Sequence, residues 1–134
     1  MKTYLAFLAL AAGLLAAAGA PAIAHHSFGA EFDSEQGFEY SGVVTKIEWL
    51  NPHVYFYMDV DEEGTGQITN WAMEMGSPNG LMRRGWTRNS LRIGDEVQVE
   101  GSKARDGSDK GNARSVILES GRQLFAGSSE DATP

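Results

Sequence analysis

Cysteine is missing from the 134-residue chain. Without cysteine the protein can form no disulfide, attach no haem through a CxxCH motif, ligate no iron–sulfur cluster and use no thiol in catalysis. A blue-copper centre also requires a cysteine ligand, so that class of site is excluded as well. Secreted domains of this size often depend on disulfides, but a chain of roughly this length can bury enough surface to fold without them.

Basic residues are few. Lysine and arginine total 11 against 18 aspartates and glutamates, which gives a net charge of −7. Proteins that bind nucleic acid non-specifically, or that dock on anionic lipid, rely on Lys and Arg to neutralise phosphates. We therefore expect neither nucleic acid nor an anionic membrane surface as a partner. The sequence also contains no phosphate-binding loop and no HExxH motif, and it suggests no Ser-His-Asp grouping.

Long apolar runs occur only near the N-terminus. Lys2 precedes the apolar stretch YLAFLALAAGLLAAA, and the following APAIA places Ala22 and Ala24 at small-x-small positions. This pattern is typical of a secretion signal over residues 1–24, cleaved between Ala24 and His25. The apolar stretch is short and rich in alanine, so we expect no stable membrane insertion after cleavage. The exported chain would lose one basic and no acidic residue.

The remainder of the chain has the pattern of short strands. Apolar and polar residues alternate in 53–60, and β-branched or alternating runs recur at 38–50, 67–75, around Val97 and at 113–119. Between the third and fourth runs, GSPNGLMRRGW offers a capping serine, a proline at the first helical position and a terminating glycine. These features predict one short helix at that point.

Five strands with a helix between the third and fourth is the order of an OB-fold, a partly open Greek-key barrel. We therefore predict an all-β protein with a small five-stranded OB-fold-like barrel over residues 38–125; a small β-sandwich is the alternative. Residues 25–37 would form a separate N-terminal segment. Residues 126–134 are small, polar and acidic, which predicts a disordered tail.

Three histidines are present, and two of them directly follow the expected cleavage site. After cleavage His25 would offer two nitrogen ligands, its α-amine and its imidazole, and His26 would offer a third. An N-terminal histidine that chelates through both groups is similar to the histidine brace of lytic polysaccharide monooxygenases and of some periplasmic copper-binding proteins. Nitrogen ligands in a flat array suit Cu(II), which also heads the divalent affinity series. Copper is therefore the cofactor that this N-terminus predicts.

His53 stands at the start of the second strand and could complete such a site. If residues 34–37 (SEQG) form a turn, residues 25–33 run back beside the first strand and bring His25 close to the end of that strand. We therefore predict a metal site made by His25 and His53, with His26 as an alternative or additional ligand. The competing interpretation is an exposed, easily processed N-terminus that binds copper weakly and without purpose, together with a surface or core histidine at position 53.

Several other side chains could take part in binding. Glu74 is either a carboxylate ligand or base, or a solvated strand acid. Tyr55, Tyr57, Trp71 and Trp86 could form an aromatic platform on a strand face and its flanking loops, where OB barrels bind extended ligands.

The only cluster of basic and aromatic residues is RRGWTR, which groups Arg83, Arg84 and Arg88 around Trp86. It could hold a carboxylate, a phosphate or the face of a sugar. The alternative is a helix C-terminus that carries favourable positive charge.

Three functions follow from these features. The first is a metal-binding protein, with copper as the metal, for storage, delivery or sensing. The second is a metal-independent binding or adaptor module that recognises a peptide, a sugar or a partner protein on its aromatic face. The third, a copper oxidase of the monooxygenase kind, has only the brace analogy in its favour, so we do not expect an enzyme.

Five motifs taken together resemble a known family: AHHSFGAEFD, GVVTKIEWLNPH, NWAMEMGSPN, RRGWTR and GDEVQVEG. They resemble a family of small exported bacterial proteins of unknown function, domain of unknown function 6152. The resemblance covers nearly all of the chain after the signal. It implies a bacterial, periplasmic protein, and it implies no established activity, cofactor or site residues.

Overall fold

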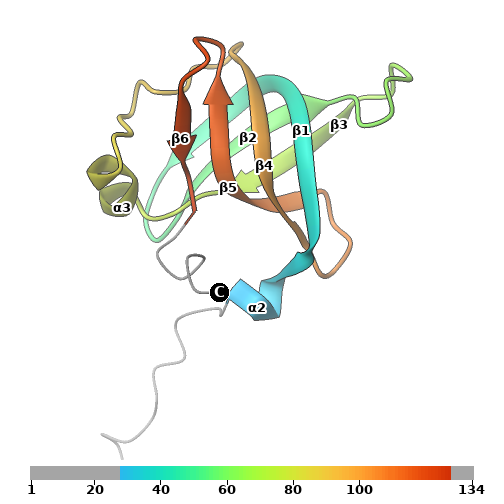
Figure 1. The fold of residues 1–134 in the computed structure, drawn as a ribbon, viewed down its shortest axis with the longest axis horizontal. Helices are drawn as coiled ribbons and strands as arrows, with labels where there is room; N and C mark the ends of the chain where they lie inside the picture. The colour runs from blue at the N-terminus through green and yellow to red at the C-terminus, as the bar shows by residue number, and fades with distance from the viewer. Residues whose placement is uncertain (1–27, 128–134) are drawn as a thin grey trace, which may run out of the picture.

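Six strands of the computed structural model form one sheet that closes on itself (Figure 1). The structure describes residues 28–127. In chain order the elements are α2 (Phe28–Glu31), β1 (Phe32–Trp49), β2 (Val54–Val60), β3 (Thr69–Glu74), α3 (Pro78–Arg83), β4 (Glu96–Ala104), β5 (Lys110–Leu118) and β6 (Gln123–Phe125).

Closure of the sheet depends on one parallel pairing. The strand order is β3-β2-β1-β4-β5-β6, and β3 additionally pairs with β5 in parallel, whereas the other pairs are antiparallel. Strands β1, β2, β3, β5 and β4 therefore make a ring of five, and β6 joins the edge of β5 beyond its contact with β3. This ring, with α3 between the third and fourth strands, confirms the predicted all-β, OB-fold-like class. A sandwich of two sheets does not form, because all six strands belong to one sheet.

The core lies inside the ring and follows the alternation of the sequence. In β2 the side chains of Val54, Phe56, Met58 and Val60 are buried, while the tyrosines between them lie on the outer face. Residues of the other strands fill the same core, among them Trp71, Met73, Val97, Val99, Ala113 and Val116. Burying large apolar side chains of this kind stabilises a fold by about 1.5–3 kcal/mol each.

The predicted short helix is present as α3. Ser77 caps its N-terminus by accepting a hydrogen bond from the backbone N–H of Gly80 (3.2 Å), and Pro78 occupies the first turn. Gly85 follows the helix with φ of +92°, a conformation that glycine adopts without steric cost. Leu81 is fully buried in the core and Pro78 is buried as well, so both apolar side chains anchor α3.

The predicted turn at residues 34–37 is wrong. Asp33 pairs with Lys103 and Gly37 with Ser102, so residues 34–36 bulge out of a strand that keeps its direction. The Asp33 carboxylate holds the bulge by accepting hydrogen bonds from the Glu35 N–H (3.2 Å) and the Gln36 side chain (3.1 Å). Because pairing with β4 continues through the bulge, the chain before it does not run back beside the first strand. It continues instead into α2.

The C-terminal end of the described chain packs on the sheet. Ala126 is buried, its N–H donates to the carbonyl of Arg114 (2.8 Å) and its own carbonyl accepts from the N–H of Gly76 (2.8 Å). Ala126 and Gly127, which the sequence places in the tail, are therefore part of the folded domain. Several predicted features lie outside the described residues: the rest of that tail, the signal segment 1–24, and His25, His26 and Ser27.

Candidate functional site

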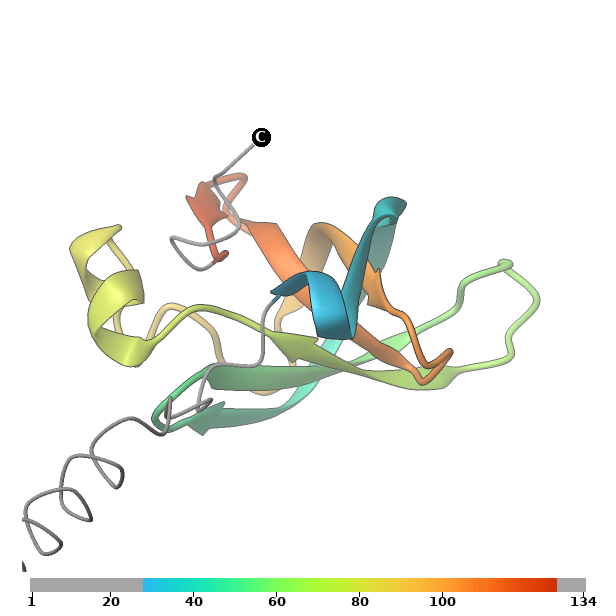
Figure 2. The same ribbon diagram turned by 90° about the horizontal axis from the view of Figure 1, so that it is seen from below.

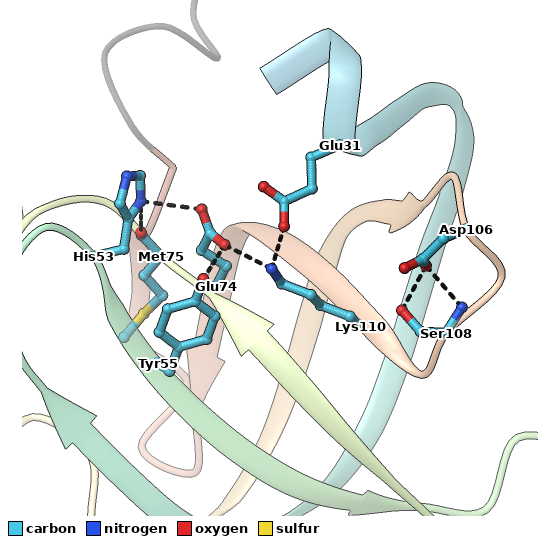
Figure 3. Close-up of polar contacts among 8 residues, drawn as sticks. All are labelled: Glu31, His53, Tyr55, Glu74, Met75, Asp106, Ser108 and Lys110. Atoms are coloured by element: carbon cyan, nitrogen blue, oxygen red, sulfur yellow. Dashed lines mark hydrogen bonds and ion pairs between the residues drawn. The ribbon is translucent and has the colours of Figure 1, made fainter. Parts of the chain in front are cut away.

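His53 lies in the short connection between β1 and β2, with one ring nitrogen held by the protein. Its Nδ1 is 3.1 Å from the carbonyl oxygen of Met75 and 3.1 Å from Oε1 of Glu74 (Figure 3). Both neighbours are acceptors, so Nδ1 is the protonated nitrogen facing them, and in the neutral imidazole the lone pair is then on Nε2. In Figure 3, Nε2 is on the side of the ring away from both partners. The side chain is 36% exposed, so part of the ring is accessible to solvent.

Glu74 is a buried carboxylate at the end of β3, only 6% exposed. It lies directly opposite Tyr55 in the β2–β3 ladder, and the Tyr55 hydroxyl donates to its Oε2. With the imidazole on its other oxygen, the carboxylate is surrounded by donors. A buried charge is tolerated only when it is paired in this way. Its burial and its hydrogen bonds therefore contradict the alternative that Glu74 is a solvated acid on the surface of the strand.

Lys110 supplies the positive charge for this carboxylate. It begins β5, whose parallel pairing with β3 places its ammonium 3.2 Å from Oε2 of Glu74. The same ammonium also pairs with the carboxylate of Glu31 in α2. Burial lowers the pKa of Lys110, but the two carboxylates outweigh it and hold the pKa above its ordinary value. Burial, and then the Glu74 carboxylate, raise the pKa of the Tyr55 hydroxyl.

The sequence did not point to Glu31 or Lys110. Glu31 is one acid among 18, and Lys110 stands in a stretch rich in turn residues. Only the parallel register of β3 and β5 brings Lys110 beside Glu74, and that register is set by residues far apart in the chain. Nothing in the sequence indicated that Glu74 and His53 pair with each other, although each residue was a candidate on its own.

The predicted aromatic platform is reduced to two tyrosines. Trp71 is buried, and its indole N–H donates a hydrogen bond to Glu62 (2.9 Å). Trp86 is also buried, and its indole N–H donates a hydrogen bond to the carbonyl of Phe125 (2.9 Å). Both tryptophans therefore belong to the core. Tyr55 and Tyr57 do lie on the outer face.

The hydroxyls of both outer tyrosines are hydrogen-bonded to carboxylates of the protein, that of Tyr55 to Glu74. The hydroxyl of Tyr57 donates to Glu48 (2.9 Å), and the ammonium of Lys46 lies 4.9 Å from its ring centroid.

The basic cluster after α3 fastens the C-terminal part of the domain. The guanidinium of Arg84 donates to the carbonyl of Gly127, and its carbon lies 4.7 Å from the centroid of the Phe125 ring. Arg83 is exposed on α3, and Arg88 lies 5.9 Å from the ring of Trp49. Arg84 and Trp86 thus hold residues 125–127 in place, which is a structural role.

Comparison with family models gives a match over residues 11–113 to a family of unknown function, DUF6152. The chain belongs to DUF6152. The match begins within the expected signal and ends in β5, so it includes His53, Glu74 and Lys110 of the DUF6152 domain. Comparisons with curated proteins and with solved structures return no significant match.

Within residues 28–127 of this DUF6152 chain, no three metal-ligating side chains gather at one point. His53 and Glu74 are neighbours, but further ligands would have to come from elsewhere. The predicted ligands His25 and His26 lie just ahead of the first described residue, Phe28. In the same described range no helix is both long and apolar enough to cross a membrane.

Proposed function

We propose that this DUF6152 chain is a periplasmic metal-binding protein that holds a copper ion between its processed N-terminus and His53, for storage, delivery or sensing. His25 contributes its α-amine and imidazole, His53 contributes Nε2, and His26 is an alternative or additional ligand. Cleavage after Ala24 is required, because any residue ahead of His25 converts its amine into an amide that no longer chelates in the same way.

The observation that supports this function is the environment of His53. Histidines that bind metals usually donate their second ring nitrogen to a carboxylate or to a backbone carbonyl, which fixes the tautomer and the ring orientation. Nδ1 of His53 has one partner of each kind at 3.1 Å, Glu74 and the Met75 carbonyl. Nε2 is then a pre-oriented nitrogen donor.

The position of α2 supports the N-terminal half of the site. Glu31 of α2 contacts Lys110, and Lys110 contacts the carboxylate that orients His53. The described chain therefore begins in the same polar cluster. His25 is three residues ahead of Phe28, and three extended residues span about 10 Å. An approach through α2 is the route that we propose for the N-terminus, in place of the turn at 34–37 that the sequence suggested.

Copper is the metal that suits these ligands. The donors are an amine and imidazoles, with no thiolate because the chain has no cysteine. Nitrogen donors of this kind suit Cu(II), which leads the divalent affinity series. The acidic balance of the chain, net −7, also favours a cationic ligand.

The test is a copper titration of protein exported with its own signal, after its intact mass has shown that it begins at His25. Affinity is measured by competition with a chromophoric chelator. We expect His53→Ala, and separately a glycine added ahead of His25, to weaken binding at least about tenfold. Tyr57→Phe, a change on the same outer face of β2, is the matched control and should leave affinity unchanged.

Equal copper affinity in the wild type, His53→Ala and the extended form would contradict this function. It would show that the terminus binds copper as any exposed histidine does. A mass that starts at another residue would remove the role proposed for the His25 amine.

A further inference from the structure

A groove of about 500 Å³ crosses β1, β4 and β5. The three strands are neighbours in the sheet, with β4 in the middle (Figure 1). Residues 41–43, 96–98 and 117–119 line the groove. The site around His53 draws instead on the β1–β2 connection, β3 and the start of β5, so the groove is a separate surface.

Apolar and acidic side chains lie next to each other on the outer side of this groove. Val97 is buried in the core, so Glu96 and Gln98 beside it point outward, because side chains alternate along a strand. The ladders place Val43 opposite Glu96 and Ile117 opposite Gln98, on the same face. Val43 is 40% exposed and Ile117 is half-buried, so accessible apolar surface adjoins a carboxylate.

Two carboxylates meet at one end of the groove. Val97 pairs with Leu118, so Glu96, which precedes Val97, and Glu119, which follows Leu118, come next to each other where the ladder ends. Both glutamates are exposed, and neither has a salt-bridge partner among the residues that the structure describes. Like charges in neighbouring strands destabilise a sheet. A cation bound between them would relieve that repulsion.

A second pair of glutamates on the same face is treated differently by the fold. Glu39 lies directly opposite Glu100 in the β1–β4 ladder. The guanidinium of Arg114 lies 3.3 Å from Oε1 of Glu100, and the side-chain amide of Gln98 donates to Glu39. The described part of the chain thus provides partners for this pair and leaves the pair in the groove available to an external cation.

We propose that the groove is a docking surface for a basic, extended segment of a partner protein, in which Lys or Arg and apolar side chains lie two residues apart and therefore on one face. The basic groups pair with Glu96 and Glu119, and the apolar side chain packs on Val43 and Ile117. Lys and Arg suit both parts of the groove, because their aliphatic stems lie on apolar surface while their charged ends reach a carboxylate.

Charge selects the occupant of the groove. Nucleic acid and anionic lipid have the same sign of charge as its carboxylates, and so does a second copy of this chain, with its net charge of −7. A basic partner meets a complementary surface, which speeds encounter and disfavours like-charged competitors. A small amine would pair with the carboxylates but leave Val43 and Ile117 uncovered, so a peptide segment makes fuller use of the groove.

The test is a titration of isotope-labelled, copper-free protein with the peptide GKGVGKG, followed by two-dimensional NMR. We expect the amide signals of residues 41–43, 96–98 and 117–119 to shift together and to saturate. Added salt should weaken binding, because the ion pairs are exposed to solvent. The peptide GEGVGEG reverses the charge and GKGSGKG removes the apolar side chain, so each should bind more weakly than GKGVGKG.

Two double variants separate the groove from the overall charge of the protein. Glu96→Gln with Glu119→Gln removes the carboxylates of the groove, whereas Glu35→Gln with Glu63→Gln removes the same charge from exposed residues elsewhere. We expect the first to bind GKGVGKG about two- to tenfold more weakly, as for the loss of two exposed ion pairs, and the second to bind like the wild type. Val43→Thr should also weaken binding. Unchanged signals outside the groove show that each variant folds like the wild type.

Several results would overturn this proposal. If no saturable shifts appear at millimolar peptide, the groove is not a docking surface. If both double variants weaken binding equally, the affinity comes from the net charge of the chain. If GKGVGKG and GKGSGKG bind equally and spermine shifts the same amides as strongly, the groove takes small polycations rather than a peptide segment. These measurements are made without copper, so they succeed or fail independently of the metal-binding function.

Discussion

At the scale of single residues, Gly42 is a position in β1 where the neighbouring strand β2 leaves no room for a side chain. A Cβ atom added there would lie 2.2 Å from the backbone oxygen of Asp59 and 2.7 Å from the terminal methyl of Met58. The methionine could move, but the backbone oxygen belongs to the β1–β2 ladder and cannot yield without breaking the pairing. Glycine is required here by close packing.

We therefore expect Gly42→Ala to lower the free energy of unfolding by about 1–3 kcal/mol, the usual cost of overpacking, and to fall at the upper end of that range. Gly29→Ala is the control, because a Cβ atom at that position of α2 would meet nothing within 4 Å. Alanine there should be neutral or slightly stabilising. Urea unfolding followed by circular dichroism measures both changes. Equal stability of Gly42→Ala and the wild type would mean that β1 and β2 are less closely packed than described.

Individual residues of the candidate site were only partly predictable from the sequence. His53 and Glu74 stood out by residue type, because histidine is rare in the chain and a carboxylate can serve as ligand or base. The contact between them could not be predicted, because it depends on the ladder that places Glu74 opposite Tyr55 and on the carbonyl of Met75. Trp71 and Trp86 were candidates for an outer platform, but both indoles find acceptors at the edge of the core.

At the scale of elements, the connection between β2 and β3 is held to the ring by Glu62. Its carboxylate accepts hydrogen bonds from the hydroxyl of Tyr40 in β1 (2.7 Å) and from the indole of Trp71 in β3 (2.9 Å). The ammonium of Lys103 lies 3.9 Å from the same carboxylate and 5.3 and 5.4 Å from the two ring centroids. One acid thus joins three strands at this end of the molecule.

This arrangement makes stability depend on pH. The hydrogen bond from Tyr40 is the main cause that holds the pKa of Glu62 below its ordinary value; partial burial opposes it, while Trp71 and Lys103 add to it. A lowered folded-state pKa stabilises the protein above the unfolded pKa of Glu, and that stabilisation is lost as the pH falls from about 4.5 through the folded value. Tyr40→Phe should therefore be less stable than the wild type at pH 7, and the difference should narrow in acid. Urea unfolding at pH 7 and at about pH 3.5 measures it.

A Glu62→Gln background provides the control for this prediction. The amide does not titrate in this range, so Tyr40→Phe should cost the same free energy at both pH values in that background. A difference that stays constant with pH in the wild-type background would show that the Tyr40–Glu62 contact does not govern the ionisation of Glu62.

Elements defined by local pattern were predicted well, and those defined by distant partners were not. The alternation of β2 and the cap of α3 appear where the sequence placed them, because side-chain period and capping chemistry act within a few residues. The polar run at 34–37 has the composition of a turn. Pairing with β4 on both sides of it makes it a bulge, and nothing local in the sequence reports that register.

At the scale of the whole molecule, closure of the ring assembles the candidate site. His53 comes from the β1–β2 connection, Glu74 from β3, Lys110 from β5 and Glu31 from α2. These positions span most of the described chain. The parallel contact of β3 with β5 brings Glu74 and Lys110 together, and the ion pair of Lys110 with Glu31 adds α2. Figure 2, which views the ring from below, shows α2 beside these strands. The predicted OB-like order was sufficient to indicate a closed ring, but not to show which side chains meet on its outer face.

The copper site that we propose depends on the folded ring, so copper should stabilise the protein against heat. A ligand present at 100 times its dissociation constant stabilises the native state by about 2.7 kcal/mol when the unfolded chain does not bind it. In the proposed site the amine and imidazole of His25 would remain available after unfolding, so the gain would reflect only the extra affinity that His53 provides in the fold. We expect calorimetry to show Tm rising by a few degrees with copper in the wild type. His53→Ala should still bind copper weakly at its terminus yet show almost no rise, because its folded and unfolded chains would then offer the same ligands. An equal rise in both proteins would mean that the fold recruits copper through a nitrogen other than that of His53.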